Sequence, residues 1–246
     1  MRKLVLSLIA VIFCVGAVTA QKNEHVKVKM PYNETRNVGN FNALNVSSVF
    51  NVYISDGNSS SVQIRSSHDV LKYITTEVVS GTLVIKLTKA PEKWESQGQK
   101  RRIDISISKS NLSAIRASGA VDIHGLGVIK TGNLVVIASG ASDVKINAEV
   151  SGELTCTASG SSDIELKGSG NNASVKASGS SDVEMKRFIL NSAKVMVSGA
   201  SDVTVNATEY LDLSASGSSD IKYYGEPKRV DVRKSGAADI ERGRKK

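Results

Sequence analysis

The sequence predicts an all-β protein that folds as a right-handed parallel β-helix with about 20 residues in each coil. The main observation is a six-residue motif, Ser-Gly-[Ala/Ser]-[Ser/Ala/Val]-Asp-[Val/Ile], that occurs seven times in the second half of the 246-residue chain. Consecutive copies begin 18 to 21 residues apart, which is typical of stacked coils. The seven glycines, which we expect at tight turns, are Gly119, Gly140, Gly160, Gly179, Gly199, Gly217 and Gly236.

Apolar and polar residues alternate between the copies of the motif. In residues 143–160, for example, Val144, Ile146 and Ala148 alternate with polar residues. This period of two indicates short strands with one buried face. Short connections also suit an antiparallel meander, but identical residues that return at the same phase favour coils stacked in parallel, about 4.8 Å apart.

The residue before each Ser-Gly pair is small in every copy except the last. A small residue lets the core narrow into a sharp corner, and the positions are Ala117, Ala138, Ala158, Ala177, Val197, Ala215 and finally Lys234. Terminal repeats of solenoids are expected to be atypical and polar, because no further coil covers them. We therefore expect the β-helix to end near Ile240, followed by a basic tail at 241–246.

The N-terminus has the pattern of a secretory signal peptide over residues 1–20. Arg2 and Lys3 precede an apolar stretch, and small residues end it before Gln21. Residues 21–37 are polar, and we expect them to be poorly ordered. No later stretch approaches the ~20 apolar residues of a membrane helix. The sequence thus predicts an exported chain without a transmembrane segment in its mature form, located in the periplasm, on the cell surface or in the medium.

Residues 38–110 keep the strand pattern but not the repeated motif. We interpret them as opening coils with a hairpin-like cap, in one β-helix domain over 38–240 whose repeats occupy 111–240. Residues 49–54 and 62–64 are expected to form one hairpin, and residues 75–79 and 83–87 another. Between 89 and 102, a loop that contains Trp94 is expected to leave the stack.

Seven equivalent aspartates are the first candidates for a functional site: Asp122, Asp143, Asp163, Asp182, Asp202, Asp220 and Asp239. At glycine-containing corners their carboxylates are expected to accept hydrogen bonds from turn amides and serine hydroxyls, a structural role. The alternatives are a calcium row along Asp143, Asp163, Asp182, Asp202 and Asp220, and contact with a ligand. For a ligand, Trp94 and Tyr224 are the candidate contact residues.

The sequence favours a binding protein over an enzyme. Glycoside hydrolysis needs two carboxylates in different environments, whereas these aspartates are equivalent. We find no catalytic residues, no cofactor site and no metal-ligand cluster in the sequence. Nucleic acid is not an expected partner, because aromatic residues make up 4% of the chain and offer little surface for stacking on bases.

The segments FNALNVSSVFNVYISDG and EVVSGTLVIKLTK, followed by the repeated SG[AS]SD[VI] corners, resemble the auto-transporter adhesin head domain family, also called the head GIN domain. The resemblance covers roughly residues 38 to 240. It implies an exported β-helical protein of bacterial envelopes with an adhesive role, and it supplies no catalytic residues.

These observations predict an exported, non-catalytic, adhesin-like protein of the bacterial envelope that binds polysaccharide or an envelope or surface protein. The alternative is a periplasmic structural or signal-associated module that binds a protein partner. A carbohydrate-active enzyme is a more remote alternative.

Overall fold

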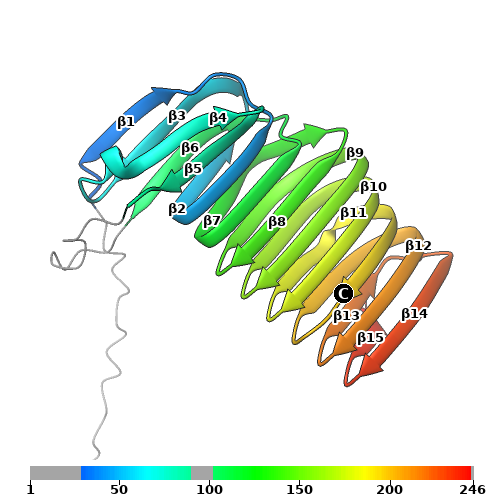
Figure 1. Cartoon of the computed structure of the whole chain (residues 1–246). Helices are drawn as coiled ribbons and strands as arrows, with labels where there is room; N and C mark the ends of the chain where they lie inside the picture. Colours follow the sequence, from blue (N-terminus) through cyan, green and yellow to red (C-terminus); the bar gives the residue numbers. More distant parts are fainter. Residues whose placement is uncertain (1–28, 90–101, 245–246) are drawn as a thin grey trace, which may run out of the picture.

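The repeats form a parallel β-solenoid of about six turns with about 20 residues in each turn (Figure 1). The computed structural model describes residues 29–89 and 102–244. Within these residues the first strands of the chain lie at one end of the stack and the last strands at the other (Figure 1). The core is the column of side chains that point into the coils.

The described residues contain fifteen strands and one short 3-10 turn. Their bounds are β1 (Tyr32–Asn37), β2 (Ala43–Ser55), β3 (Asn58–Ser66), η1 (Leu71–Tyr73), β4 (Ile74–Val79), β5 (Thr82–Leu87), β6 (Ile103–Lys109), β7 (Ala114–Thr131), β8 (Leu134–Gly140), β9 (Asp143–Gly160), β10 (Asp163–Gly179), β11 (Asp182–Val197), β12 (Asp202–Gly217), β13 (Asp220–Tyr224), β14 (Arg229–Gly236) and β15 (Asp239–Arg242).

The coils stack in parallel, and each motif residue lies beside the equivalent residue of the neighbouring coil. Asp163 pairs with Asp143 on one side and with Asp182 on the other. Backbone hydrogen bonds continue through the corners, as in the 2.8 Å bond from the Ser161 amide to the Gly140 carbonyl. The parallel register confirms the predicted stacking and excludes the antiparallel meander for the repeats.

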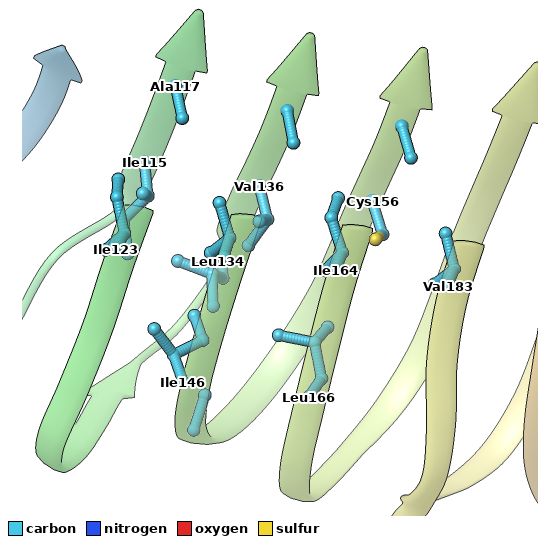
Figure 2. Packing of buried hydrophobic residues seen from close by; sticks show 14 of the residues in the cluster. Ile115, Ala117, Ile123, Leu134, Val136, Ile146, Cys156, Ile164, Leu166 and Val183 are labelled. Carbon is cyan, nitrogen blue, oxygen red and sulfur yellow. The ribbon is translucent and has the colours of Figure 1, made fainter. Parts of the chain in front are cut away.

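The core is a set of columns in which each coil adds one side chain. In one of them, Val136, Cys156, Val175, Val195 and Leu213 are all completely buried. Figure 2 shows how inward side chains such as Val136 and Cys156 follow one another from coil to coil. Burial raises the pKa of the Cys156 thiol to about 12, so the thiol stays protonated as part of the core.

The N-terminal end of the stack is covered by antiparallel strands. Of the polar segment 21–37, expected to be poorly ordered, residues 32–37 instead form strand β1, which pairs with β3 along its whole length. Arg36 secures this strand, since its guanidinium donates to the carbonyls of Leu71 and Ile74 at 2.8 and 2.5 Å. The order of β1 thus comes from edge pairing and from the contacts of one half-buried arginine.

The predicted hairpin between residues 49–54 and 62–64 is wrong. Strand β6 lies between β2 and β3, parallel to the first and antiparallel to the second. The connection passes over the end of β6 at Gly57, whose φ is 136° and where a Cβ would lie 3.1 Å from Ser108 Cβ. The other predicted hairpin is confirmed, because β4 and β5 pair in antiparallel fashion.

At the other end, the last strand extends slightly beyond the predicted boundary. Strand β15 runs to Arg242, so the first two residues of the expected basic tail belong to the stack. Glu241 forms an ion pair of 2.5 Å with Lys222 of the preceding coil.

Candidate functional site: the corner face

The seven motif glycines form the corners of the stack. Their φ angles lie between 75° and 91°, in the region that side chains rarely adopt. They also touch one another, since a Cβ on Gly160 would lie 2.7 Å from the Gly140 carbonyl oxygen. Each corner therefore has room for hydrogen only, and this keeps the coils in register.

Buried serines close the corners. Ser142, Ser162, Ser181, Ser201 and Ser219, each just before a motif aspartate, are completely buried. The Ser162 hydroxyl donates to the Ser159 carbonyl at 2.9 Å, and the Ser159 amide donates back to the same hydroxyl at 3.1 Å. Sequence reasoning expected the aspartate carboxylates to accept hydrogen bonds at the corners, which stays a prediction, and it did not identify these buried serines. The available signal was serine at this position in five of the seven motifs.

The aspartates form a surface column along the stack. Asp122 and Asp143 are half-buried, and the other five are exposed. Desolvation by burial, followed by the charges of Asp163 and Asp122, raises the pKa of Asp143. Desolvation and the charge of Asp163 likewise raise the pKa of Asp182, against a backbone hydrogen bond from Asp202 that lowers it. Neighbouring carboxylates in this column thus repel one another.

An eighth corner precedes the seven. Strand β2 lies on β7 so that Ser48 pairs with Gly119 and Asn51 with Asp122. Ser48 adopts a φ of 98°, which places a serine in the conformation of a corner glycine. The sequence motif predicts no corner before residue 111, because Ser48 replaces the glycine and Asn51 replaces the aspartate.

The aspartate column ends in neutral and paired groups on this side. The Asn51 amide donates to Asp104 at 3.3 Å, and Asp104 forms an ion pair of 2.8 Å with Arg102. The side chain of Tyr53 lies beside them, stacked on His124 with ring centroids 5.4 Å apart. Sequence reasoning missed this aromatic pair, because its members come from β2 and β7, which are distant from each other in the sequence.

We use the name corner face for the outward side of the strands that follow the corners. A hollow of about 630 Å³ lies in this face over β10. Its charges are divided. Carboxylates lie toward the corners and most cations lie farther along the strands. The charged lining residues are Asp163, Glu165, Asp182, Glu184, Lys145, Lys167, Lys186 and Arg187.

A β-bulge in β11 places two of these cations. Between Glu184 and Arg187 this strand has one residue more than the facing part of β10, so Lys186 and Arg187 are both exposed. Side chains of β12 satisfy the displaced backbone, since Thr204 Oγ1 accepts from the Met185 amide and the Asn206 amide donates to the Lys186 carbonyl. The bulge is therefore held in place from the next coil.

The cations of the hollow differ in their partners. Lys167 forms an ion pair of 2.7 Å with Glu165, and this contact lowers the pKa of Glu165. Lys186 lies over the Tyr224 ring, 4.6 Å from its centroid. Lys145 and Arg187 also line the hollow, and neither forms an ion pair within the described part of the chain.

The predicted ligand-contact residues have different positions. Tyr224 lies beside the hollow, but Lys186 covers one part of its ring, and a Cβ on Gly243 would lie 2.3 Å from another. Its ring therefore supports Lys186 more than it offers a stacking surface. Trp94 lies outside the described residues.

No group of three or more His, Cys, Asp or Glu side chains is placed to hold a metal ion in residues 29–89 and 102–244. Each coil supplies one carboxylate to the aspartate column, and the next outward position is lysine, glutamate or threonine in successive coils, without a regular order. These residues also contain no helix that is long and apolar enough to span a membrane.

Solved structures share this architecture. The chain is 25% identical to a putative adhesin from Bacteroides fragilis NCTC 9343, with a TM-score of 0.77 over 86% of this chain and 96% of that one. A putative adhesin from Parabacteroides distasonis ATCC 8503 is 18% identical, with a TM-score of 0.64 over 88% of this chain and 98% of that one. A putative lipid binding protein from the same strain is 17% identical, with a TM-score of 0.62 over 85% and 96% of the two chains.

The last two likenesses, below 25% identity, show the fold alone. No curated protein matches the chain. Among families of known sequences, residues 40–227 match the one described as "Putative auto-transporter adhesin, head GIN domain". This match covers most of the chain and agrees with the motifs and with the observed solenoid. The chain therefore belongs to the family of putative auto-transporter adhesin head GIN domains.

Proposed function

We propose that the protein is a non-catalytic, adhesin-like binding protein that is exported to the bacterial envelope, and that its corner face binds a polysaccharide. Membership of a family described as adhesins supports a role in binding. The signal-peptide pattern of residues 1–20 supports export to the periplasm, the cell surface or the medium.

The divided hollow over β10 is the observation that carries this proposal. Its carboxylates can accept hydrogen bonds from sugar hydroxyls, and its lysines and arginine can donate to hydroxyl, ring and acidic oxygens. Lys145 and Arg187 have no ion-pair partner in the described chain, so a ligand does not have to break a salt bridge to reach them. The corner face also continues along the stack, which suits a polymer with repeating units.

The aspartate column favours binding over hydrolysis. A glycosidase needs one carboxyl group held protonated and a second held ionised, each in its own environment. Here the pKa values of Asp143 and Asp182 are both raised, and desolvation by burial is the leading cause for each. Equivalent groups do not divide the roles of acid and base.

A glycan array tests the proposal. The mature protein is expected to retain a subset of polysaccharides, and Arg187→Ala is expected to weaken that binding about tenfold, equivalent to the loss of one charge-assisted contact. Lys176→Ala is the matched control, because Lys176 is an exposed cation of β10 on the other side of the corner.

Two results would contradict the proposal. If Lys176→Ala weakens glycan binding as much as Arg187→Ala does, the corner face is not the binding surface. If no glycan is retained and one specific envelope protein is recovered instead, the chain is a periplasmic structural or signal-associated module, which is the alternative expected from the sequence.

A further inference from the structure

The C-terminal end of the solenoid has an unpaired strand edge. Strand β14 pairs with β12 on one side, and no strand among the described residues pairs with its other side. Strand β15 pairs with β13 and with no other strand of the described chain. These two strands form the last coil of the stack, at the end opposite β1 (Figure 1). The N-terminal end, in contrast, is covered by β1 and β3.

The hydrophobic core is also open at this end. Val232 continues the column that contains Val195 and Leu213, but its exposed fraction is 48%, against 0% for both of them. Val230 and Ile240, which continue two other columns, are half-buried. Inward-facing apolar side chains beside an unpaired backbone edge are a template for strand pairing.

The outward side chains of β14 carry charges of both signs. Arg229, Asp231 and Arg233 alternate with the inward valines. Asp231 is held by Arg229 at 2.8 Å and by the Tyr210 hydroxyl at 2.9 Å, and Arg233 contacts Asp212. These contacts hold both side chains on the outer face of the last coil.

We propose that β14 pairs with β14 of a second copy of this chain, in antiparallel orientation about a two-fold axis at Val232. Residues directly opposite each other in an antiparallel pair lie on the same face of the sheet. In this register Val232 lies opposite Val232 of the second copy, and Asp231 lies opposite Arg233 in both directions. The pairing is isologous, because one surface serves both copies.

Charge complementarity and the length of the paired segment select this register. A two-fold axis at Asp231 would place Asp231 against itself and Arg229 against Arg233, and an axis at Arg233 would place Arg233 against itself. Like charges directly opposite each other destabilise a pair of strands. An axis between two residues would place the inward side chains of one copy opposite the outward side chains of the other. The axis at Val232 avoids all three conflicts. An axis at Val230 would also place Asp231 opposite Arg229, but it would pair only residues 229–231 of β14, whereas the axis at Val232 pairs residues 229–235.

The same axis brings the two open cores together. A two-fold rotation perpendicular to the β14 face reverses the stacking direction, so the second solenoid continues the first one tail to tail. Val230, Val232 and Ile240 then face the end of another core. Lys234 opposes Val230 of the second copy, and its charge is already offset by Asp239 at 3.3 Å.

Sedimentation velocity of the mature protein over a range of concentrations tests the association. We expect a concentration-dependent dimer, and we expect Val232→Asp to weaken it by at least about tenfold, because two carboxylates would meet at the axis. Val79→Asp is the control, since Val79 is as exposed (52% against 48%) but belongs to β4 at the other end. A monomeric wild-type protein would overturn the proposal, as would equal effects of the two substitutions.

Cross-linking tests the register. With a short bis-maleimide, Val232→Cys is expected to form covalent dimers, because the two sulfurs would meet at the axis. Val230→Cys is expected to form few, because the two copies of residue 230 would lie four residues apart, about 13 Å. Cys156 is completely buried and does not compete for the reagent. Equal cross-linking at the two positions would exclude the proposed register, and a melting temperature for each variant verifies its fold.

Discussion

The Ser162 hydroxyl and the Ser159 backbone are bound to each other twice, with the hydroxyl donating to the carbonyl at 2.9 Å and accepting from the amide at 3.1 Å. The single hydrogen of this hydroxyl is shared with a second acceptor, the Ala138 carbonyl of the preceding coil, whose oxygen lies 3.1 Å away. Since Ser162 is completely buried, water cannot replace these contacts. This serine therefore joins its own corner to the preceding coil.

Ser162→Ala is expected to destabilise the protein by about 1–3 kcal/mol, because it leaves buried backbone groups without their partner. Ser161→Ala is the control, since Ser161 is the exposed neighbour in the same corner. Urea unfolding followed by circular dichroism gives both free energies of unfolding. Equal losses in the two variants would show that the buried hydroxyl does not stabilise the corner.

Gly160→Ala is expected to be more damaging than a usual surface substitution. The φ of 83° alone costs about 1–2 kcal/mol for a side chain, and the Cβ would lie 2.7 Å from the Gly140 carbonyl oxygen, so two coils must separate. Gly132→Ala has free space around its Cβ and no positive φ, and it serves as the reference. The melting temperature of each variant is the measurement. If both variants melt alike, contact between corner glycines does not determine the spacing of the coils.

Asp182→Asn is expected to stabilise the protein slightly at pH 7, by no more than about 0.5 kcal/mol, because this carboxylate is exposed and screened by solvent. Its pKa is raised in the folded state, so the folded protein binds the proton more tightly than the unfolded chain does. The destabilising contribution is therefore present above the folded pKa and disappears as the pH falls below the ordinary aspartate value.

Thermal melts of wild type and Asp182→Asn between pH 3 and pH 7 should consequently converge at the acidic end. Asp212→Asn serves as a contrast, because Asp212 contacts Arg233 instead of other carboxylates. A lower stability of Asp182→Asn at pH 7 would mean that the carboxylate is needed at the corner, as the sequence analysis expected.

Calcium is expected to leave the melting temperature unchanged. Ca²⁺ takes six to eight oxygen ligands, whereas each coil offers one aspartate to the column. The melting temperature in millimolar Ca²⁺ and in EDTA provides the comparison, with Mg²⁺ as a control for ionic strength. A rise in melting temperature with Ca²⁺ alone, abolished by Asp163→Asn, would restore the calcium row along the corners.

Much of the repeat region could be predicted because its information is local and recurrent. The motif spacing, the alternation around Val144 and the glycine corners all lie within one coil, and stacking each coil on its copy extends them through the protein. The hairpin of β4 and β5 could also be predicted, since only two residues connect its strands. The role of Ser162 could not be predicted from the sequence, because the burial of a corner residue depends on the coil that covers it.

The sequence by itself determined the parallel solenoid, the length of its coils, the inward face of each strand and the positions of the seven glycine corners. Only the tertiary structure decided that β6 lies between β2 and β3, that Ser48 forms a corner, and that a bulge held by Thr204 and Asn206 opens a hollow with divided charge. The reason is physical. Periodicity reports contacts between equivalent residues, whereas the cap and the hollow depend on contacts between residues that are unlike and distant along the chain.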